Sequence, residues 1–354
     1  MRIGIDGRKI ADYGIGTWIR GLLGGLAAAR AAHDFVLFGP PSIDAFLPPD
    51  LRIERRDAGA PHYSLRELLV VGAAARRAKL DLFHAPHYVV PFVSGPVVVT
   101  IHDLIHLHRR PVKPFERIYA RRMIARAIRR SRIVTTVSET VAGDIERTFP
   151  GARGKIEVVP NGVLTRFVSE RQPRDEALVG SLGLEAGAFF LFVGNDKPHK
   201  NLEGLVAAWR LARGAMPTAR LAIAGSEPAR FRDEERVSLL GFVDEGLLGV
   251  LYRCALAVVL PSWDEGFGLP VAEAMASGTP VICSDIPALR EVGGDAPRYV
   301  PAGNAEALRD ALLGVMRNAH DRDGMIRAGR ARAALFSWQR AAERMLAIWD
   351  RARS

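Results

Sequence analysis

The stretch PSWDEGFGLPVAEAMA, residues 261–276, predicts a turn that runs directly into a helix. Pro270 suits the first helical position, where its missing N–H costs nothing. Glycines let the backbone of the turn approach a ligand with no side chain in the way. Backbone N–H groups from Leu269 onward would point out of the positive end of the helix dipole, which favours a phosphate. The turn residues that we assign to this site are Gly266, Phe267 and Gly268.

Two carboxylates bracket this turn. Glu265 lies on the loop, and Glu273 follows eight positions later in the first helical turn. Because a diphosphate repels carboxylates at close range, we expect both groups to accept hydrogen bonds from sugar hydroxyls on either side of it. The alternative is an ordinary acidic helix start, where Asp and Glu are common.

The bulk composition is that of an ordinary soluble globular protein, with 48% hydrophobic and 25% charged residues. A length of 354 residues suggests two domains or one large one. Cys254 and Cys283 both lie in apolar runs, which predicts reduced core residues of a cytosolic protein. The N-terminus has the pattern of a strand rather than a signal peptide, and no apolar run approaches the roughly 18 residues of a membrane span. We therefore expect a soluble or peripheral protein.

The net charge of +10 is unevenly distributed along the chain. Residues 1–165 hold 25 Lys+Arg and 15 Asp+Glu, whereas residues 166–354 hold 24 of each. The whole excess therefore lies in the N-terminal half. Such asymmetry predicts an anionic partner for that half, whether a membrane surface, a phosphorylated acceptor or nucleic acid.

The chain opens with a buried strand, a glycine-rich turn and a helix over residues 18–29, the start of a βαβ unit. Gly14 and Gly16 resemble part of a dinucleotide fingerprint, but Ile19 stands where a third glycine would be expected. A Rossmann dehydrogenase is therefore weakly supported. The two remaining interpretations are a close approach to a phosphate and a plain tight turn.

His102 follows a β-branched strand at residues 96–101. Polar residues at the carboxyl end of a buried parallel strand lie where open α/β sheets bind ligands, so His102 is a candidate site residue. His84 and His87 could line the same site, and His106 and His108 are interpreted as structural or acceptor-side residues. No cysteine accompanies these histidines, and we assign no metal site to them.

An arginine-rich helix is predicted at residues 113–132, with apolar anchors between the charges. A solvated basic face and a surface for anionic lipid headgroups are the two interpretations. Nucleic acid is not expected, because no aromatic-interleaved or groove-reading motif accompanies the charge. The basic residues are Arg117, Arg121, Arg122, Arg126, Arg129, Arg130 and Arg132.

The second half restarts with a buried strand at residues 189–193, a loop carrying cations, and a helix over residues 202–213. A strand, a cationic loop and a helix start together form a phosphate-binding arrangement. The loop residues assigned to it are Asn195, Lys197 and Lys200. The charged segment at residues 164–185 is predicted to be irregular and to form the interdomain linker.

Residues 261–282, PSWDEGFGLPVAEAMASGTPVI, resemble the donor-site signature of retaining, nucleotide-sugar-dependent glycosyltransferases of family four. The resemblance implies a GT-B fold, in which two doubly wound Rossmann-like α/β domains face each other across a cleft. Residues 1–170 would bind the acceptor, with a helix at about 338–354 packing back on them. Residues 171–337 would bind the nucleotide sugar.

The resemblance also implies roles for individual residues. His102, Lys200 and Glu265 would be catalytic: a histidine at the sugar, the donor-phosphate lysine, and the glutamate that faces the donor sugar. Glu273 would bind the ribose. Further donor contacts are implied for Gly14, Gly16, Phe242, Val243 and the turn after Glu265. Asn195 stands where the family often has Arg, and Lys197 would supply the missing charge.

The expected activity is transfer of a hexose, with mannose and GDP-mannose favoured, to a glycan or lipid-linked acceptor in polysaccharide or glycolipid synthesis. The segment PHKN at residues 198–201 carries the mannose preference by its resemblance to mannosyltransferases. No metal or other cofactor is implied, and the base stays open because backbone groups read it in this architecture. The expected location is cytoplasmic, or peripheral on the inner face of the membrane. The alternatives are a GT-B nucleotide-sugar epimerase or hydrolase, and a non-catalytic basic protein that binds membrane or nucleic acid.

Overall fold

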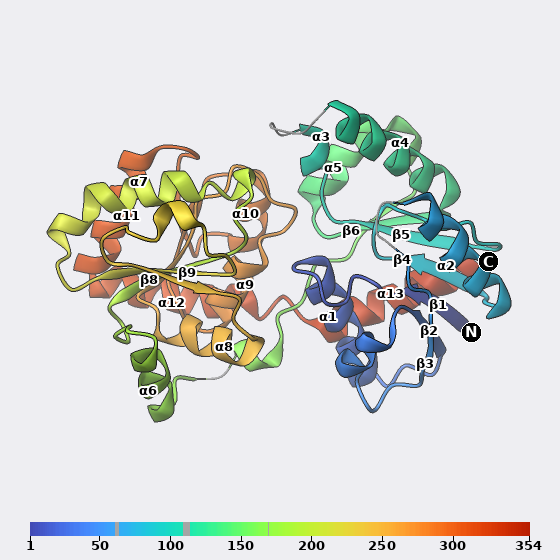
Figure 1. The fold of residues 1–354 in the computed structure, drawn as a ribbon, viewed down its shortest axis with the longest axis horizontal. Coiled ribbons are helices and arrows are strands. Elements are labelled where there is room, and N and C mark those ends of the chain that lie inside the picture. Colours follow the sequence, from blue (N-terminus) through green and yellow to red (C-terminus); the bar gives the residue numbers. More distant parts are fainter. Residues whose placement is uncertain (61–63, 109–113, 169) are drawn as a thin grey trace. The chain divides into compact units, whose positions relative to one another are not determined.

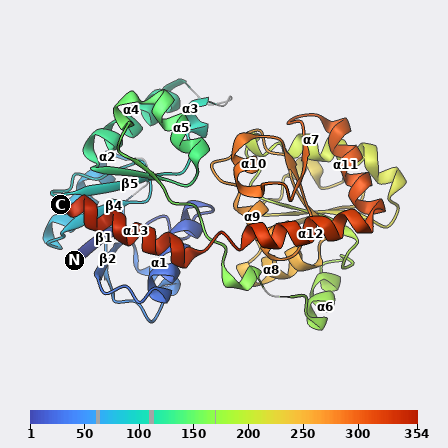
Figure 2. The ribbon, with the colours of Figure 1, turned by 180° about the vertical axis from the view of Figure 1, so that it is seen from behind.

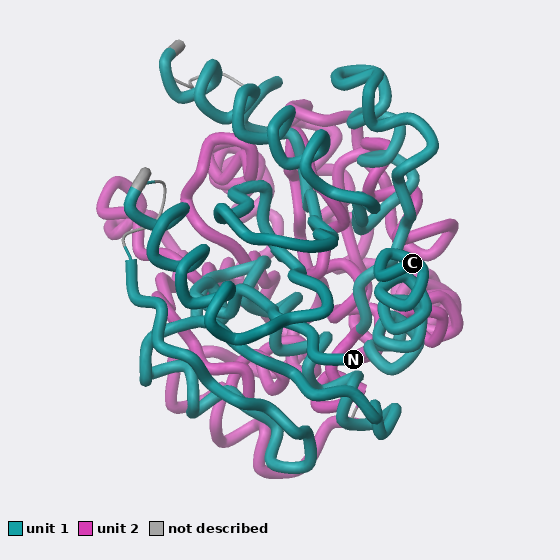
Figure 3. The backbone as a smooth tube through the Cα atoms, turned by 90° about the vertical axis from the view of Figure 1, so that its right-hand side faces the viewer, with its two compact units in different colours: residues 1–162, 337–354 teal, residues 163–336 magenta. Residues whose placement is uncertain are grey.

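A computed structural model describes residues 1–60, 64–108, 114–168 and 170–354. The chain forms two compact units, coloured separately in Figure 3. Unit 1 comprises residues 1–162 and 337–354, and unit 2 comprises residues 163–336. Each unit is built on its own parallel sheet.

Unit 1 contains a seven-stranded sheet within the described residues, in the order β3-β2-β1-β4-β5-β6-β7. All its neighbouring strands run parallel, and Ile5 of β1 pairs with Leu37 on one side and His84 on the other. The strands are β1 (Arg2–Asp6), β2 (Asp34–Phe38), β3 (Ile53–Arg56), β4 (Leu82–Ala85), β5 (Val97–Ile101), β6 (Ile133–Thr136) and β7 (Ile156–Val158).

Helices cover both faces of this sheet (Figure 1). One hydrophobic core lies between the strands and the buried sides of α2, α4 and α5. On the other face α1 packs against α13, the C-terminal helix drawn in red in Figure 2. The helices are α1 (Ile15–Ala28), α2 (Leu65–Arg77), α3 (Ile105–His108), α4 (Pro114–Arg130), α5 (Glu139–Thr148) and α13 (Trp338–Arg353).

Glycines on α1 create the space that α13 occupies. A Cβ at Gly21 would lie 2.1 Å from the Trp338 ring, and one at Gly25 would lie 2.1 Å from the Trp338 carbonyl oxygen. A Cβ at Gly162 would meet the Trp338 backbone nitrogen at the same distance. Such distances are far inside van der Waals contact, so only glycine permits this packing.

Unit 2 repeats the plan with a six-stranded parallel sheet in the order β10-β9-β8-β11-β12-β13. Its strands are β8 (Phe189–Val193), β9 (Arg220–Ala224), β10 (Val237–Gly241), β11 (Ala257–Leu260), β12 (Val281–Ser284) and β13 (Arg298–Val300). Its helices are α6 (Pro173–Ser181), α7 (Leu202–Ala212), α8 (Glu245–Cys254), α9 (Leu269–Ala276), α10 (Pro287–Gly293), α11 (Ala305–Arg317) and α12 (Ala319–Ala333). Cys254 and Cys283 are buried and unpaired here, as the sequence predicts, and burial raises the pKa of both thiols.

The prediction of an irregular linker at residues 164–185 is wrong, because α6 lies within it. Its first turn is held by a reciprocal capping box between Gln172 and Asp175. Asp175 is fully buried and accepts two hydrogen bonds from Arg253 of α8, at 2.9 and 3.1 Å. This buried ion pair anchors α6 to α8. The units divide at residues 162/163 and 336/337.

Other boundaries differ by a few residues. The first helix begins at Ile15 rather than at residue 18, so Gly16 lies inside its first turn. The helix predicted over residues 113–132 is described from Pro114 to Arg130, and residue 113 lies outside the described residues. Ser138 caps α5 by accepting a hydrogen bond from the N–H of Val141.

Adjacent glycines of α1 provide a matched test of the packing with α13. Gly25→Ala should lower the free energy of unfolding by about 1–3 kcal/mol, because the new methyl collides with the Trp338 carbonyl. Gly24→Ala meets nothing within 4 Å and should raise it by roughly 0.5–1 kcal/mol through helix propensity. Urea unfolding followed by circular dichroism measures both, and equal effects would contradict this account.

Candidate active site

The loops after β8 and β11 leave neighbouring strands at the carboxyl edge of the unit 2 sheet. The strand order turns between β8 and β11, so the crossovers on either side run in opposite directions. Open α/β sheets bind ligands at such a switch point. The loop after β8 carries Lys200, and the loop after β11 carries Glu265.

Lys200 and Glu265 meet across this edge although 65 positions separate them. The Lys200 Nζ donates to Glu265 Oε1 at 2.7 Å, and the two side chains are 14% and 8% exposed. The same oxygen accepts a hydrogen bond from Ser262 Oγ at 2.6 Å. Sequence reasoning missed Ser262, whose only signal is its place three residues before the glutamate. Two donors thus hold the carboxylate, while an ammonium with three N–H donors keeps two for another anion.

Backbone contacts fix the two loops to each other. The N–H of Trp263 donates to the carbonyl of His199 at 2.7 Å, and Asn201 Nδ2 donates to the carbonyl of Pro261 at 3.0 Å. Asn201 adopts a left-handed conformation with φ of 54°, a region that asparagine tolerates well. The relative placement of Lys200 and Glu265 is therefore set before any ligand binds.

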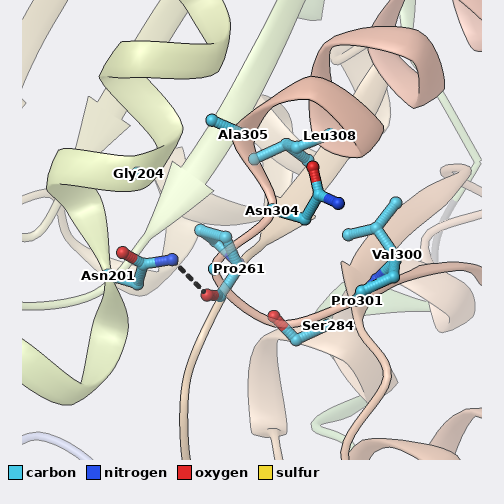
Figure 4. Close-up of a pocket in the computed structure, with 10 residues that line it drawn as sticks. Asn201, Gly204, Pro261, Ser284, Val300, Pro301, Asn304, Ala305 and Leu308 are labelled. Carbon is cyan, nitrogen blue, oxygen red and sulfur yellow. Dashed lines mark hydrogen bonds between the residues drawn. The ribbon is translucent and has the colours of Figure 1, made fainter.

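A small pocket lies beside these anchors (Figure 4). Asn201, Pro261, Ser284 and Asn304 contribute to its lining. Ser284 is buried, and its hydroxyl has no hydrogen-bond partner in the described part of the chain. Gly303 closes one side, because a Cβ there would overlap the Trp263 ring. Lys200 and Glu265 are not among the residues that line this pocket. The pocket thus lies next to the residues that anchor the two loops and does not contain the ion pair.

The predicted turn before α9 is present, and its residues also have structural tasks. Gly268 has φ of 94° and caps the helix, which begins at Leu269. Phe267 is buried and packs edge-on against Phe336, with ring centroids 5.4 Å apart. The N–H of Val271 donates to the Gly268 carbonyl at 2.9 Å. Donor contacts by Gly266, Phe267, Gly268 and Leu269 stay predictions, and the ring of Phe267 packs inside unit 2.

Glu273 lies in α9 and is buried. Its Oε2 accepts a 2.8 Å hydrogen bond from the hydroxyl of Tyr252, which is itself fully buried in α8. Burial, with the neighbouring Glu273 as a smaller cause, raises the pKa of Tyr252 well above its ordinary value. The tyrosine therefore stays a donor to the carboxylate. No sequence pattern identified Tyr252 as this partner.

Three glycines end three adjacent strands at the same edge of the sheet. Gly194, Gly225 and Gly241 all have positive φ. The N–H of Gly194 donates to the Ala224 carbonyl at 2.9 Å, and that of Gly225 to the Gly241 carbonyl at 2.6 Å. Phe242 follows directly and is 75% exposed, while Val243 is half-buried. An exposed aromatic ring beside bare backbone is a platform on which a planar base can stack.

The cations of the loop after β8 are not equivalent. Lys197 is exposed, and its N–H donates to the side chain of Asn195. Arg230, which sequence reasoning missed, donates from Nη2 to Asp196 at 2.6 Å and also pairs with Glu203. Asp196, the acidic residue of the loop after β8, is thus neutralised by an arginine from outside the loop. Lys197 and Lys200 therefore dominate the local charge of the loop.

In unit 1, His102 lies just after β5, as predicted. Its Nε2 lies 3.0 Å from the Pro86 carbonyl, and its ring packs edge-on against Trp18 at 5.5 Å. A carbonyl only accepts, so Nε2 carries the proton and Nδ1 of the neutral ring is an acceptor. Burial lowers the pKa of His102, more than Asp103 raises it, which favours the neutral ring.

His84 does not line a site, contrary to expectation. It is fully buried in β4, bonded through Nε2 to Thr100 Oγ1 at 2.8 Å, and enclosed by Trp18 and Trp349. Burial, with His102 as a smaller cause, lowers its pKa to about 3. His87 stacks on Tyr88, and His106 and His108 are exposed on α3. Among the described residues no three His, Cys, Asp or Glu side chains gather as metal ligands.

The two N-terminal glycines differ in their surroundings. Gly14 is exposed, has φ of 61°, and has open space around the position of a Cβ. Gly16 is buried, and its Cβ would lie 2.5 Å from the Ile10 carbonyl oxygen. Packing of the helix start therefore explains Gly16. The approach of Gly14 and Gly16 to a donor phosphate stays a prediction.

Only part of the arginine-rich helix faces solvent. Arg126 donates to the Val90 carbonyl and stacks on Phe92, and Arg130 donates to the carbonyls of Val93 and Gly95. Arg132 lies beyond the helix and binds carbonyls at the end of α13. The exposed residues of α4 include Phe115, Arg117, Ile118, Arg121, Arg122 and Arg129. No helix in the described ranges is both long and apolar enough to span a bilayer.

Comparisons with known proteins agree over both units. Residues 13–167 match the family model described as Glycosyltransferase Family 4, and residues 176–332 match the one described as Glycosyl transferases group 1. The O-antigen chain mannosyltransferase B of Escherichia coli is 26% identical over 92% of this chain and 93% of that protein. A phosphatidyl-myo-inositol mannosyltransferase of Mycobacterium leprae is 27% identical over 82% and 77%.

Solved structures share the fold. WaaG, a glycosyltransferase of lipopolysaccharide biosynthesis, has a TM-score of 0.79 at 14% identity, covering 98% of this chain and 99% of its own. Anabaena HepE in complex with UDP and glucose has a TM-score of 0.77 at 18% identity, covering 99% of each chain. The predicted GT-B fold, with two doubly wound Rossmann-like domains, is confirmed.

The burial of His84 makes stability depend on pH. Its pKa is about 3 in the folded protein and 6.5 ordinarily, so the unfolded chain binds the proton more readily between these values. Stability should therefore fall as the pH drops below about 6.5, by about 1.4 kcal/mol of unfolding free energy per pH unit.

Urea unfolding between pH 4 and pH 7 measures this slope. His84→Gln should flatten the dependence of stability on pH. His106→Gln changes an exposed histidine and leaves the His84 ring in place, so it should keep the wild-type slope. An unchanged slope in the His84 variant would assign the acid sensitivity to other groups.

Proposed function

This chain belongs to the glycosyltransferases of family four and group one, and on that premise we propose that it transfers mannose, with retention, from GDP-mannose to a hydroxyl of a glycan or lipid-linked acceptor. The observation that carries the proposal is the Lys200–Glu265 pair at the switch point of the unit 2 sheet. The names of its mannosyltransferase relatives favour mannose over other hexoses.

The chemical problem is the charge on the leaving group. As the bond to the sugar breaks, negative charge gathers on the terminal phosphate of the nucleoside diphosphate. Lys200, Lys197 and the start of α9 would stabilise that charge more in the transition state than in the ground state. In this scheme protein cations take the place of a divalent metal.

The carboxylates would orient the donor. Glu265, held by Lys200 and Ser262, would accept a hydrogen bond from a sugar hydroxyl. Glu273, positioned by Tyr252, would accept from the ribose diol. These groups bind hydroxyls and need no proton of their own, which suits carboxylates that already receive donors from the protein.

His102 and the acceptor complete the mechanism. The free lone pair of His102 Nδ1 would accept from a hydroxyl of the transferred sugar, because the neutral ring leaves that atom unprotonated. The departing phosphate would take the proton of the acceptor hydroxyl as the new glycosidic bond forms on the same face of the sugar. The acceptor oxygen then replaces the phosphate oxygen on the sugar, and the nucleoside diphosphate leaves with the proton.

A surface role for α4 belongs to the same proposal. Its exposed face combines Phe115, which is 77% exposed, and Ile118 with Arg121, Arg122 and Arg129. Apolar residues between cations suit an anionic membrane surface, where a lipid-linked acceptor would reside. We propose peripheral binding on the inner face of the membrane, with the remainder of the protein in the cytoplasm.

The main rivals differ in what they do with the donor. A nucleotide-sugar epimerase or hydrolase of this fold would share the phosphate site and would consume donor without an acceptor. A non-catalytic binding protein would show no loss of function in Glu265→Ala or Lys200→Ala. Chromatography of a donor incubated with and without acceptor extract separates these cases.

Nucleotide binding should depend on Lys200. A thermal-shift panel of GDP-mannose, GDP, UDP-glucose and UDP-N-acetylglucosamine should show stabilisation by the GDP compounds, roughly 2.7 kcal/mol at 100 times the dissociation constant. Lys200→Ala should abolish the shift and lower kcat by about 10²–10³-fold. Arg317→Ala, an exposed cation of the same unit, should behave as the wild type. Stabilisation by UDP compounds alone would exclude GDP-mannose as the donor. Stabilisation by none of these nucleotides would contradict the proposed transferase activity.

Vesicle binding should depend on the exposed arginines of α4. Each surface arginine contributes about 1 kcal/mol near an anionic membrane, so Arg122→Ala/Arg129→Ala should weaken cosedimentation with phosphatidylglycerol vesicles about 30-fold. The charge-matched control Arg309→Ala/Arg317→Ala lies on unit 2 and should bind as the wild type. Equal binding by both double variants would refute a membrane role for this face.

A further inference from the structure

A glutamate stands beside the exposed aromatic ring at the end of β10. A Cβ at Gly241 would lie 2.0 Å from Glu227 Oε1, so the carboxylate rests directly on the backbone of Gly241. Gly241 has φ of 60°, and Phe242 follows it with its ring in solvent. The positive φ favours glycine at position 241, and a Cβ there would displace the carboxylate from this place. The carboxylate thus lies at the backbone of the residue that directly precedes Phe242.

The loop that carries Glu227 is held on both sides. Gly225 donates to the Gly241 carbonyl at 2.6 Å, and Ser226 Oγ reaches the Gly194 carbonyl at 3.4 Å. On the other side Pro228 is buried, and its carbonyl accepts from the N–H of Phe231 in a short 3-10 turn, Ala229–Phe231. The backbone that carries Glu227 is thus held in place on both sides.

Glu227 itself has no assigned task. Among the described residues its carboxylate makes no hydrogen bond and no ion pair, although it is exposed next to a basic loop. The nearest arginine in the sequence, Arg230, is engaged by Asp196 and Glu203. An acid kept close to bare backbone and left without a cation is suited to accept hydrogen bonds from a ligand.

We propose that Glu227 selects guanine as the base of the donor, by accepting hydrogen bonds from two neighbouring N–H groups while the base stacks at Phe242. This inference rests on the proposed nucleotide-sugar donor and names the residue that reads its base. Guanine presents N1–H and the 2-amino group side by side, which matches the two oxygens of a carboxylate. It extends base reading from backbone groups to a side chain.

The same carboxylate works against the other bases. Uracil presents a single N–H between two carbonyl oxygens, and those oxygens would face the negative charge. Adenine and cytosine each present one amino group beside a ring nitrogen acceptor, so the second oxygen would meet a lone pair. Specificity then comes from repulsion of the wrong base as well as attraction to guanine.

The test compares nucleotides that differ by one group. Calorimetric titration should show wild-type protein binding GDP about tenfold or more tightly than inosine diphosphate, which lacks the 2-amino group, and more tightly still than UDP. Glu227→Gln keeps the shape but replaces one acceptor by a donor, so its preference for GDP over inosine diphosphate should fall to near one. Glu185→Gln, an exposed acid before β8, should keep the wild-type ratio.

The outcomes separate this inference from the function on which it rests. A preference for GDP that survives in Glu227→Gln overturns the role of Glu227 and leaves a GDP-dependent glycosyltransferase standing. A wild-type preference for UDP overturns both the role and the proposed donor. Binding of no nucleotide overturns the role together with the proposed function. Unliganded thermal unfolding of both variants, expected at the wild-type midpoint, shows that neither change acts through folding.

Discussion

The ion pair between Lys200 and Glu265 is the constraint on which the loops at the carboxyl edge of the unit 2 sheet depend. Both side chains are mostly buried, and burying either charge alone would be costly, so each requires the other to stay in place. The pair joins two loops that leave opposite sides of a topological switch point. Ser262, Asn201 and Trp263 then reinforce the same junction. An ammonium group and a carboxylate are thereby fixed side by side.

In unit 1 the candidate site residue His102 is held in place by a different kind of interaction. His102 is kept neutral by burial and oriented by a backbone carbonyl and the edge of Trp18. Behind Trp18 lies His84, which Trp349 of the C-terminal helix covers. The pair in unit 2 is fixed by opposite charges, whereas His102 in unit 1 is oriented by a hydrogen bond and an aromatic contact.

Many elements of the fold and of the candidate site could be predicted because short stretches of sequence determine them. The strand at residues 189–193, the cationic loop after it, the turn before α9 and the place of His102 at a strand end all follow from short-range patterns. The partners of these residues could not be predicted. Ser262 and Tyr252 carry no motif, and their roles arise only when distant helices and loops pack. The packing of Phe267 and Gly16 was not predicted, because glycine-rich turns suit both ligand approach and tight packing. The helix at residues 173–181 was missed because Asp175 and Arg253 are charged yet buried against each other.

The chain enters unit 2 after residue 162 and returns to unit 1 at residue 337, so unit 1 is assembled from two segments with a complete domain inserted between them. Residues 1–162 leave Gly21 and Gly25 of α1 uncovered until residues 337–354 have been synthesised. Unit 2 is formed by one continuous segment, so it can fold before α13 is available to unit 1. The order of synthesis therefore lets unit 2 fold first, although unit 1 begins the chain.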